Sequence, residues 1–252
     1  MSAENSKATS NTTSKADEME ELRDRLLLAV MDSVLFDGWT ERALRQGAEM
    51  CGEDYAVMER AFPRGIPQLL DRMADWADRQ AVDYLLSQDV ENMRVRDRIT
   101  VAVRARLEAL APYKDAVRRS MALIASPPAG RQVPGVVWRT ADRFWDAAGD
   151  TATDYNRYTK RGLLSGVLVS TTLFWLTDDS DEHEATWRFL DRRIDNVLTL
   201  GKSLGRIKPV LDRADRAVEA PRSLLRRVTS RLGGGNAGAD DTPTAPGSDA
   251  VH

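Results

Sequence analysis

The spacing of the apolar residues constrains the fold of this chain more than any other feature, because it repeats every three to four positions. The first compact segment places Leu22, Leu26 and Ala29 on one face, and the last one starts the same pattern with Trp187 and Leu190. This is the spacing of amphipathic helices, whereas a half-buried strand alternates with a period of two. No alternating pattern occurs along the sequence. We therefore predict an all-α fold.

Glycine and proline residues separate the predicted helices, and the composition of the chain ends indicates the outer limits of the folded part. Helix breaks are expected at Gly38, Gly52, the turn from Pro63 to Pro67, Pro112 and the loop from Pro127 to Pro134. Residues 1–16 and 233–252 hold too little apolar surface to order themselves. We expect these two tails to be disordered, around helical parts at 17–86, 87–201 and 202–232.

One predicted helix has an apolar stripe that arginines flank. The stripe consists of Val95, Ile99, Val103, Leu107 and Leu110. The flanking residues are Arg94, Arg96, Arg98, Arg104 and Arg106, interleaved with Asp97 and Glu108. This charge pattern predicts a solvated helix face, with a phosphate-binding face as the alternative.

A helix-turn-helix layout follows the first helix. Thr40 can cap a short helix that Gly52 ends, and Asp54 can cap a second one that ends near Phe62. Together with the preceding helix and a long helix that starts at Pro67, this layout resembles the TetR family of regulators. The resemblance implies a TetR-like helical bundle with an N-terminal helix-turn-helix-like part.

The second helix of this motif is acidic where a DNA reader needs cations. It offers Glu53, Asp54 and Glu59 against one base, Arg60. Phosphate neutralisation supplies much of the affinity of DNA-binding proteins, so three acids would repel the duplex. We therefore expect no DNA binding. A TetR-type transcriptional regulator with a lipid-sensing pocket is the alternative function.

Longer strings of the sequence carry a second and more specific resemblance. They run in order over about residues 20–200: Phe36-Asp37-Gly38-Trp39-Thr40-Glu41-Arg42-Ala43-Leu44, Leu107-Glu108-Ala109-Leu110-Ala111-Pro112, the stretch from Trp138 to Leu164, and Thr186-Trp187-Arg188-Phe189-Leu190-Asp191-Arg192-Arg193-Ile194-Asp195-Asn196. Strings of this length are far more specific than a short motif. On them, the chain resembles the Coq-nine family of ubiquinone biosynthesis proteins.

This resemblance implies a TetR-like fold that no longer regulates genes. Members of the family bind isoprenoid and phospholipid in an apolar cavity, associate with membranes and partner the di-iron hydroxylase that modifies the quinone ring. The resemblance thus implies a non-catalytic accessory protein that presents isoprenoid or quinone intermediates, or phospholipid, to a di-iron or other quinone-ring hydroxylase. The implied location is the bacterial cytoplasm at the inner membrane, or the matrix side of that membrane in eukaryotic mitochondria. A homodimer is left open.

Candidate lipid contacts lie on two predicted helices that are rich in large apolar side chains. They are Trp138, Phe144, Trp145, Leu164, Leu168 and Trp175. The first helix presents two indoles on one face with small residues between them. The second is apolar nearly all round, so it is either central core or one wall of a cavity. Plain core packing is the alternative for each single residue.

Two basic residues, Lys160 and Arg161, stand at the N-terminal end of the second helix. Amide donors and a planar guanidinium can together hold a phosphate, which suggests a headgroup clamp at the cavity mouth. The alternative is an ordinary surface pair in which Arg161 bridges to Asp154 or Asp150. The residues alone do not decide between the two.

The family resemblance also implies a surface for the hydroxylase partner. The usual family motif is Asn-Trp-Tyr-Thr, and here Asn156 is followed by Arg157, Tyr158 and Thr159. Arginine replaces tryptophan, so one aromatic anchor is missing and the contact is weaker, recoded to an acidic pocket or directed at a different hydroxylase. We assign Tyr158, Arg157, Thr159 and Asp154 to this surface.

Four aspartates recur at intervals of four residues in the same region, namely Asp142, Asp146, Asp150 and Asp154. We expect a helix break at Gly149, so these acids need not form one stripe. We interpret them as a solvated face or a docking surface rather than metal ligands. Helical di-iron sites use two Glu-x-x-His pairs, and the chain has only two histidines, one of them terminal.

The segment over residues 202–232 changes character. It holds nine basic and three acidic residues, a net charge of +6, between short apolar faces. Each basic residue near an anionic bilayer contributes about 1 kcal/mol, so the segment predicts reversible membrane association. The proposed contacts are Leu224, Leu225, Arg226, Arg227, Val228 and Leu232. A packed or dimerising helix is the alternative.

The usual catalytic constellations lack residues from which they could be built. His183 is the single internal histidine, and neither a nucleophile elbow nor a phosphate loop nor a dinucleotide fingerprint occurs. The longest charge-free stretch, Gly162 to Thr177, is too short and too rich in hydroxyl groups to span a bilayer. We therefore predict a protein without catalytic activity, cofactor or metal, and without a membrane-spanning helix.

Overall fold

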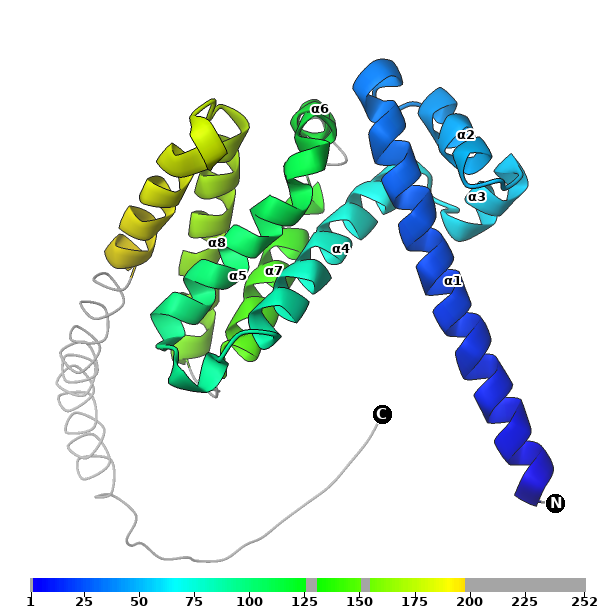
Figure 1. Ribbon diagram of the computed structural model, residues 1–252, viewed down its shortest axis with the longest axis horizontal. Coiled ribbons are helices and arrows are strands. Elements are labelled where there is room, and N and C mark those ends of the chain that lie inside the picture. The colour runs from blue at the N-terminus through cyan, green and yellow to red at the C-terminus, as the bar shows by residue number, and fades with distance from the viewer. Residues whose placement is uncertain (1, 126–130, 151–154, 198–252) are drawn as a thin grey trace, which may run out of the picture. The chain divides into compact units, whose positions relative to one another are not determined.

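The computed structural model describes residues 2–125, 131–150 and 155–197 (Figure 1). These residues form helices and contain no strand, which confirms the predicted all-α fold. The long helices are α1 (Ser2–Asp37), α2 (Glu41–Met50), α3 (Tyr55–Ala61), α4 (Ile66–Leu86), α5 (Val95–Leu110), α6 (Lys114–Ile124), α7 (Val133–Ala147), α8 (Tyr155–Leu176) and a helix over 184–197. The short 3₁₀ turns are η1 (Val90–Asn92), η2 (Ala111–Tyr113) and η4 (Asp181–His183).

Several of these helices begin and end where the sequence indicated. The Thr40 side chain accepts a hydrogen bond from the Ala43 amide and caps α2, while Asp54 occupies the corresponding position before α3 without a side-chain cap bond. The predicted break at Gly149 follows α7, and this residue has φ +83°. Only glycine enters that left-handed region without strain.

The N-terminal tail differs from the sequence-based expectation. Residues 1–16 were predicted to be disordered, whereas α1 begins at Ser2 and continues without a break to Asp37. Once the amphipathic part of a helix has formed, each further residue adds one backbone hydrogen bond and needs no buried surface of its own. The tail therefore extends α1, although its composition provides nothing to pack.

The first hydrophobic core lies between α1, α2, α3, the first half of α4, and α6, with side chains from the C-terminal ends of α5 and α8. Leu26, Val30 and Leu69 are fully buried in it, and the indole Nε1 of Trp39 donates to the Ala116 carbonyl at 2.9 Å. Helices α1 and α2 approach closely at Gly47, where an added Cβ would stand 2.5 Å from a methyl carbon of Val30. The helix-turn-helix-like part is thus a packed body built on α1.

The second core lies between the end of α4, α5, α7, α8 and the helix over 184–197. Leu85, Ala102, Phe144 and Leu164 are among its fully buried side chains. Helix α4 contributes to both cores, since its residues up to Ala77 belong to the first and its later residues to the second (Figure 1). The two cores therefore share one continuous helix.

The arginines of α5 do not all lie on a solvated face as predicted. Arg94 and Arg104 are exposed and pair with acids on their own helix. In contrast, Arg98 donates to the Ala148 carbonyl at 3.0 Å, and the Arg106 side chain is only 14% exposed. Arg106 lies three residues after Val103, so helical geometry places it on the apolar face.

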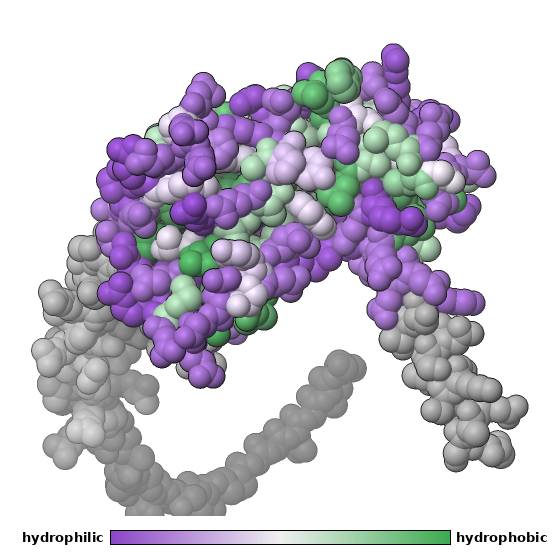
Figure 2. Space-filling view, viewed as in Figure 1, coloured by the Kyte–Doolittle hydropathy of each residue, from purple (hydrophilic) through white to green (hydrophobic). Residues whose placement is uncertain are grey.

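The surface shown in Figure 2 is mainly hydrophilic over the described residues, with hydrophobic side chains in separate groups. None of the described helices combines the length and the hydropathy needed to cross a membrane. The predicted amphipathic extension over 202–232, the tail over 233–252, and Asp154 lie outside the described residues.

Candidate functional site

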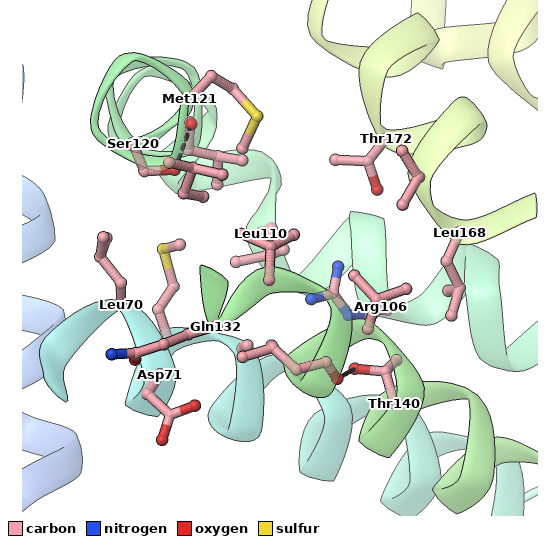
Figure 3. Close-up of a pocket in the computed structure, with 18 of the residues that line it drawn as sticks. Leu70, Asp71, Arg106, Leu110, Ser120, Met121, Gln132, Thr140, Leu168 and Thr172 are labelled. Atoms are coloured by element: carbon pink, nitrogen blue, oxygen red, sulfur yellow. Dashed lines mark hydrogen bonds between the residues drawn. The ribbon is translucent and has the colours of Figure 1, made fainter. Parts of the chain in front are cut away.

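A cavity of about 320 Å³ lies in the part of the fold that α4, α5, α6, α7 and α8 build together (Figure 3). Small-molecule sites in proteins have volumes of about 300–1,000 Å³. The cavity is therefore at the lower end of the range for a bound ligand.

The wall of this cavity is mostly apolar. Its apolar lining residues are Pro67, Leu70, Met73, Ala74, Leu110, Val117, Met121, Ile124, Val133, Val136, Val137, Leu168, Val169 and Leu173. The two methionines face the cavity from different helices, and their flexible thioether side chains adapt to ligands of different shape. Such a wall is suited to an apolar molecule and excludes strongly hydrated ones.

A small cluster of polar side chains interrupts the apolar wall. Arg106 and Thr140 both line the cavity and both bind the buried carboxylate of Asp78, which is 3% exposed. Arg106 Nε donates to one Asp78 oxygen at 2.8 Å, and the Thr140 hydroxyl donates to the other at 2.7 Å. Arg143 adds a longer contact of 3.8 Å to the same carboxylate. The cavity thus has one charged side chain held in a fixed position.

The cavity reaches the surface along α8. Val169 and Leu173 line it and are nevertheless 43% and 52% exposed. These residues lie four apart on one helix face, next to Thr172 on the lining side. The cavity wall along α8 thus includes apolar side chains that are partly exposed.

The predicted lipid contacts are distributed differently from the expectation. Of the eight residues, Leu168 lines the described cavity. Phe144, Trp145 and Leu164 are buried in the second core, and Trp175 is buried in the first. Their positions correspond to the alternative of core packing. Trp138 is 36% exposed and lies at the surface.

Arg161 is almost fully buried and forms ion pairs with three of the four aspartates in this region. Its guanidinium binds Asp142, Asp146 at 2.9 Å and Asp150 at 3.2 Å, while Lys160 binds Asp150 at 2.6 Å. The bridge to Asp150 is the alternative that the sequence left open, but it is buried rather than superficial. The carboxylates thus converge on a cation, although Gly149 breaks the helix between them.

The charges in this cluster support one another. Burial alone would lower the pKa of Arg161, but the hydrogen bonds to Asp142 and Asp150 outweigh it and raise this pKa. The hydrogen bond from Arg161, together with that from Arg157, lowers the pKa of Asp142. The guanidinium is therefore engaged on three sides by protein acids. A lipid phosphate would have to compete with all of them.

The residues assigned to a partner surface lie at the junction of α7 and α8. Tyr158 is 63% exposed, and its ring centroid is 6.2 Å from that of Trp138. Arg157, at the position where the sequence-based resemblance led us to expect tryptophan, donates to Asp142 at 3.0 Å. Thr159 is partly buried. The two aromatic rings form an exposed pair, so one indole remains at this surface although the motif has lost its own.

Most cavity residues were missed by sequence reasoning, and one of them had a usable signal. Leu70, Met73 and Met121 come from segments whose proximity depends on how the helices pack, which no local pattern reveals. Arg106 could have been found, because it lies three residues after Val103 and four before Leu110 on the apolar stripe. An arginine at such a position faces inward.

Comparisons with known proteins support a family for the chain. The rat protein "Ubiquinone biosynthesis protein COQ9, mitochondrial" is 28% identical over 197 residues, which cover 75% of this chain and 62% of the relative. The Drosophila melanogaster protein of the same name is 32% identical over 192 residues, which cover 74% of this chain and 58% of the relative. The chain thus spans about three fifths of the length of these relatives.

A solved structure shares the fold. The TetR transcriptional regulator from Nitrosomonas europaea superimposes with a TM-score of 0.59 at 20% sequence identity, covering 71% of this chain and 98% of the regulator. At this identity the likeness establishes the fold alone. The predicted TetR-like helical bundle is confirmed.

The COQ9 family model matches residues 132–201. This region contains α7, α8, the Arg161 cluster and part of the cavity wall. It also contains the strings from Trp138 onward on which the sequence-based resemblance rested. The match and the two relatives confirm that resemblance: the chain is similar to the COQ9 ubiquinone biosynthesis proteins and has a TetR-like fold.

Proposed function

We propose that this protein is a non-catalytic accessory protein of ubiquinone biosynthesis that binds an isoprenoid or quinone intermediate, or a phospholipid, and presents it to a quinone-ring hydroxylase at a membrane. The observation that carries the proposal is the apolar cavity between α4, α5, α6, α7 and α8. The similarity to proteins named for ubiquinone biosynthesis supports the pathway.

The shape of the cavity supports presentation rather than storage. Its volume of about 320 Å³ accommodates a ring and the beginning of a chain, and the rest of a long lipid would extend past Leu173 into the surroundings. A ligand held in this way keeps part of its apolar chain available to a membrane. The lipid can therefore be handed over without leaving an apolar environment.

The exposed pair of Trp138 and Tyr158 is the proposed docking point for the hydroxylase. Both rings come from the region that matches the COQ9 family, and aromatic side chains at a surface are common anchors of protein interfaces. Arg157 adds a partly exposed cation beside them, although Asp142 already binds it. A partner with an apolar pocket therefore fits this site better than one with a purely acidic surface.

The proposal is tested by filling the cavity. Met121→Trp places a large ring in it, and Met19→Trp makes the same change on the exposed face of α1 as a control. The variants and the unchanged protein are purified at full length, and co-purified lipid is extracted and identified by mass spectrometry. We expect isoprenoid, quinone or phospholipid in the unchanged protein and in Met19→Trp.

Met121→Trp should retain several-fold less lipid per protein, because the added ring occupies the volume of the ligand. Circular dichroism is measured on the same samples to show that the variant is folded. An unchanged protein free of these lipids, or equal lipid in both variants, would exclude this cavity as the binding site.

A further inference from the structure

Among the described residues that line the cavity, Arg106 is the only charged one that lies on an otherwise apolar helix face. Its neighbours on α5 in the direction of the cavity are apolar, and Figure 3 shows its nitrogen atoms between the side chains of Leu110 and Leu168. The other charged residue of the wall, Asp71, is bound by Arg139 at 2.5 Å. Arg106 is therefore the cation that a ligand in the cavity would meet.

The guanidinium of Arg106 has donors left over for a ligand. Its Nε is used by Asp78, and no acceptor for Nη1 or Nη2 occurs among the residues that the structure describes. Guanidinium groups carry five N–H donors in a rigid plane, so fixing one edge fixes the direction of the others. Asp78 thus holds the remaining donors of Arg106 in place at the cavity wall.

The charge of Arg106 is already balanced by Asp78. Asp78 faces Arg106 on one oxygen and lies 3.8 Å from Arg143 on the other, and Arg143 in turn binds Asp75 at 2.9 Å. Asp75 is shared with Arg79, which binds it at 3.0 Å and also binds Asp24 at 2.8 Å, so the cations beyond Arg106 have acidic partners of their own. A ligand anion would add an uncompensated negative charge to a largely apolar cavity, which costs free energy. A neutral oxygen atom, in contrast, can accept from the unused donors without this cost.

We propose that Arg106 is the residue that recognises the polar end of the ligand, by donating from its Nη atoms to a neutral oxygen, such as a ring carbonyl, on an otherwise apolar molecule. This inference rests on the proposed function, because it assumes that the cavity holds an apolar ligand. It adds to that function how the ligand is oriented in the cavity. The oxygen-bearing ring lies against α5 and the chain leaves beside Val169 and Leu173.

The test compares ligands that differ in their oxygen atoms. Hexylbenzoquinone carries ring carbonyls, hexylbenzene has the same chain without them, and octanoic acid carries a carboxylate. Their dissociation constants are measured by displacement of Nile red, a neutral apolar dye, from the purified full-length protein. We expect the quinone to bind about tenfold more tightly than hexylbenzene, the order of one well-placed hydrogen bond.

The variants separate recognition from stability. Arg106→Lys keeps a cation for Asp78 but replaces the planar guanidinium and its directed Nη donors by one ammonium group on a different stem, and Arg104→Lys is the matched control on the exposed side of α5. Simple removal of Arg106 would take the direct ion-pair partner from the buried Asp78 carboxylate and leave it the Thr140 hydroxyl and the longer contact to Arg143. The second variant therefore joins Arg106→Met with Asp78→Asn, which removes both charges. Both cavity variants should bind quinone and hexylbenzene equally, with hexylbenzene binding unchanged.

Three results would overturn the inference. A preference for the quinone that persists in both cavity variants excludes Arg106 as the recognising residue. Tighter binding of octanoic acid than of the quinone indicates an anion site instead. If all three ligands fail to displace the dye from the unchanged protein, the proposed function fails together with the inference, whereas equal binding of quinone and hexylbenzene leaves that function intact and refutes the inference alone.

Discussion

The charged guanidinium of Arg161 is almost fully buried. Its ion pairs with three aspartates offset the free energy that the charge loses when it leaves water. Burying a charge without partners costs several kcal/mol, so removal of one member of such a cluster is more harmful than its distance from the cavity suggests. The cluster joins α7 to α8 across the break at Gly149. Its role is therefore to fix the two helices that the COQ9 match covers.

Replacing this residue by an uncharged one of similar length should destabilise the fold. We expect Arg161→Met to lower the free energy of unfolding by about 3 kcal/mol, because Asp142 and the buried Asp150 each lose a charged partner, although Arg157 and Lys160 still bind them. Urea denaturation followed by circular dichroism measures the change. The control is Arg188→Met on an exposed pair with Glu184, which should cost no more than about 0.5 kcal/mol. Equal effects in the two variants would contradict a structural role for the cluster.

The sequence predicted the place of a candidate site residue only where the residue pattern of a single helix determines that place. Leu168 was placed at a cavity wall because the apolar residues of α8 are obvious, and it lines the cavity; Tyr158 was placed at a surface because a motif marked it, and it is exposed. The indoles were assigned to a cavity wall, yet Trp145 and Trp175 are buried in the two cores. Whether a buried face meets another helix or an empty volume depends on how five helices pack, and no single segment contains this information.

The turn between α8 and the helix over 184–197 shows how one acid can organise an element. Asp178 accepts from the Ser180 amide at 2.9 Å and from the Thr186 amide and hydroxyl at 2.8 and 2.5 Å. Burial by itself raises the pKa of Asp178, but these hydrogen bonds outweigh it, and the net pKa lies well below the ordinary value of 3.8. The ionised carboxylate is therefore the form that holds the turn.

This shift predicts a loss of stability in acid. Above about pH 5 Asp178 is ionised in both states and its contribution is complete. As the pH falls below about 4, the unfolded chain binds a proton that the folded chain does not, so the free energy of unfolding decreases. Because other acids behave similarly, the measurement is a comparison by urea denaturation at several pH values.

The variant Asp178→Asn should be less stable at pH 7 and should lose less stability between about pH 5 and pH 3 than the unchanged protein. Parallel pH curves for the two proteins would show that the turn does not depend on the ionised side chain.

Helix α3 has the position of a recognition helix but not its charge. Asp54, which precedes it, and Glu59, which lies within it, are exposed, with Arg60 as the one exposed cation between Asp54 and Ala61. We expect gel-shift experiments with genomic fragments at physiological salt to give no sequence-specific complex. A specific complex would instead support the lipid-sensing regulator. The shared TetR-like fold does not decide this point, since one fold supports many functions.

The elements were more predictable than the site, because helix ends depend on nearby residues. Gly52, Pro67 and Gly149 mark the limits of helices in the sequence and in the structure. The extension of α1 to Ser2 was not predicted, since composition measures what a segment can bury and not whether a neighbouring helix can propagate into it. The inward turn of Arg98 and Arg106 was missed because charge was taken as a sign of exposure.

The segment over residues 202–232 has a net charge of +6, which favours contact with an anionic membrane. We propose that this segment holds the protein reversibly at an anionic bilayer. Full-length protein should float with liposomes that contain anionic lipid at low salt, and less at high salt. A protein truncated after Gly201 should stay in solution under both conditions. Equal flotation of the two proteins would show that the membrane contact lies before residue 202.

Helix α4 has a consequence for how the molecule can be divided. Its apolar residues serve the first core up to Ala77 and the second core from Ala81 onward. Cutting the chain beside it would leave Leu69 and Met73, or Leu85, facing water on one of the products. The helix-turn-helix-like part is therefore not a detachable module. We expect a fragment with only the first core, or only the second, to fold only if it includes α4.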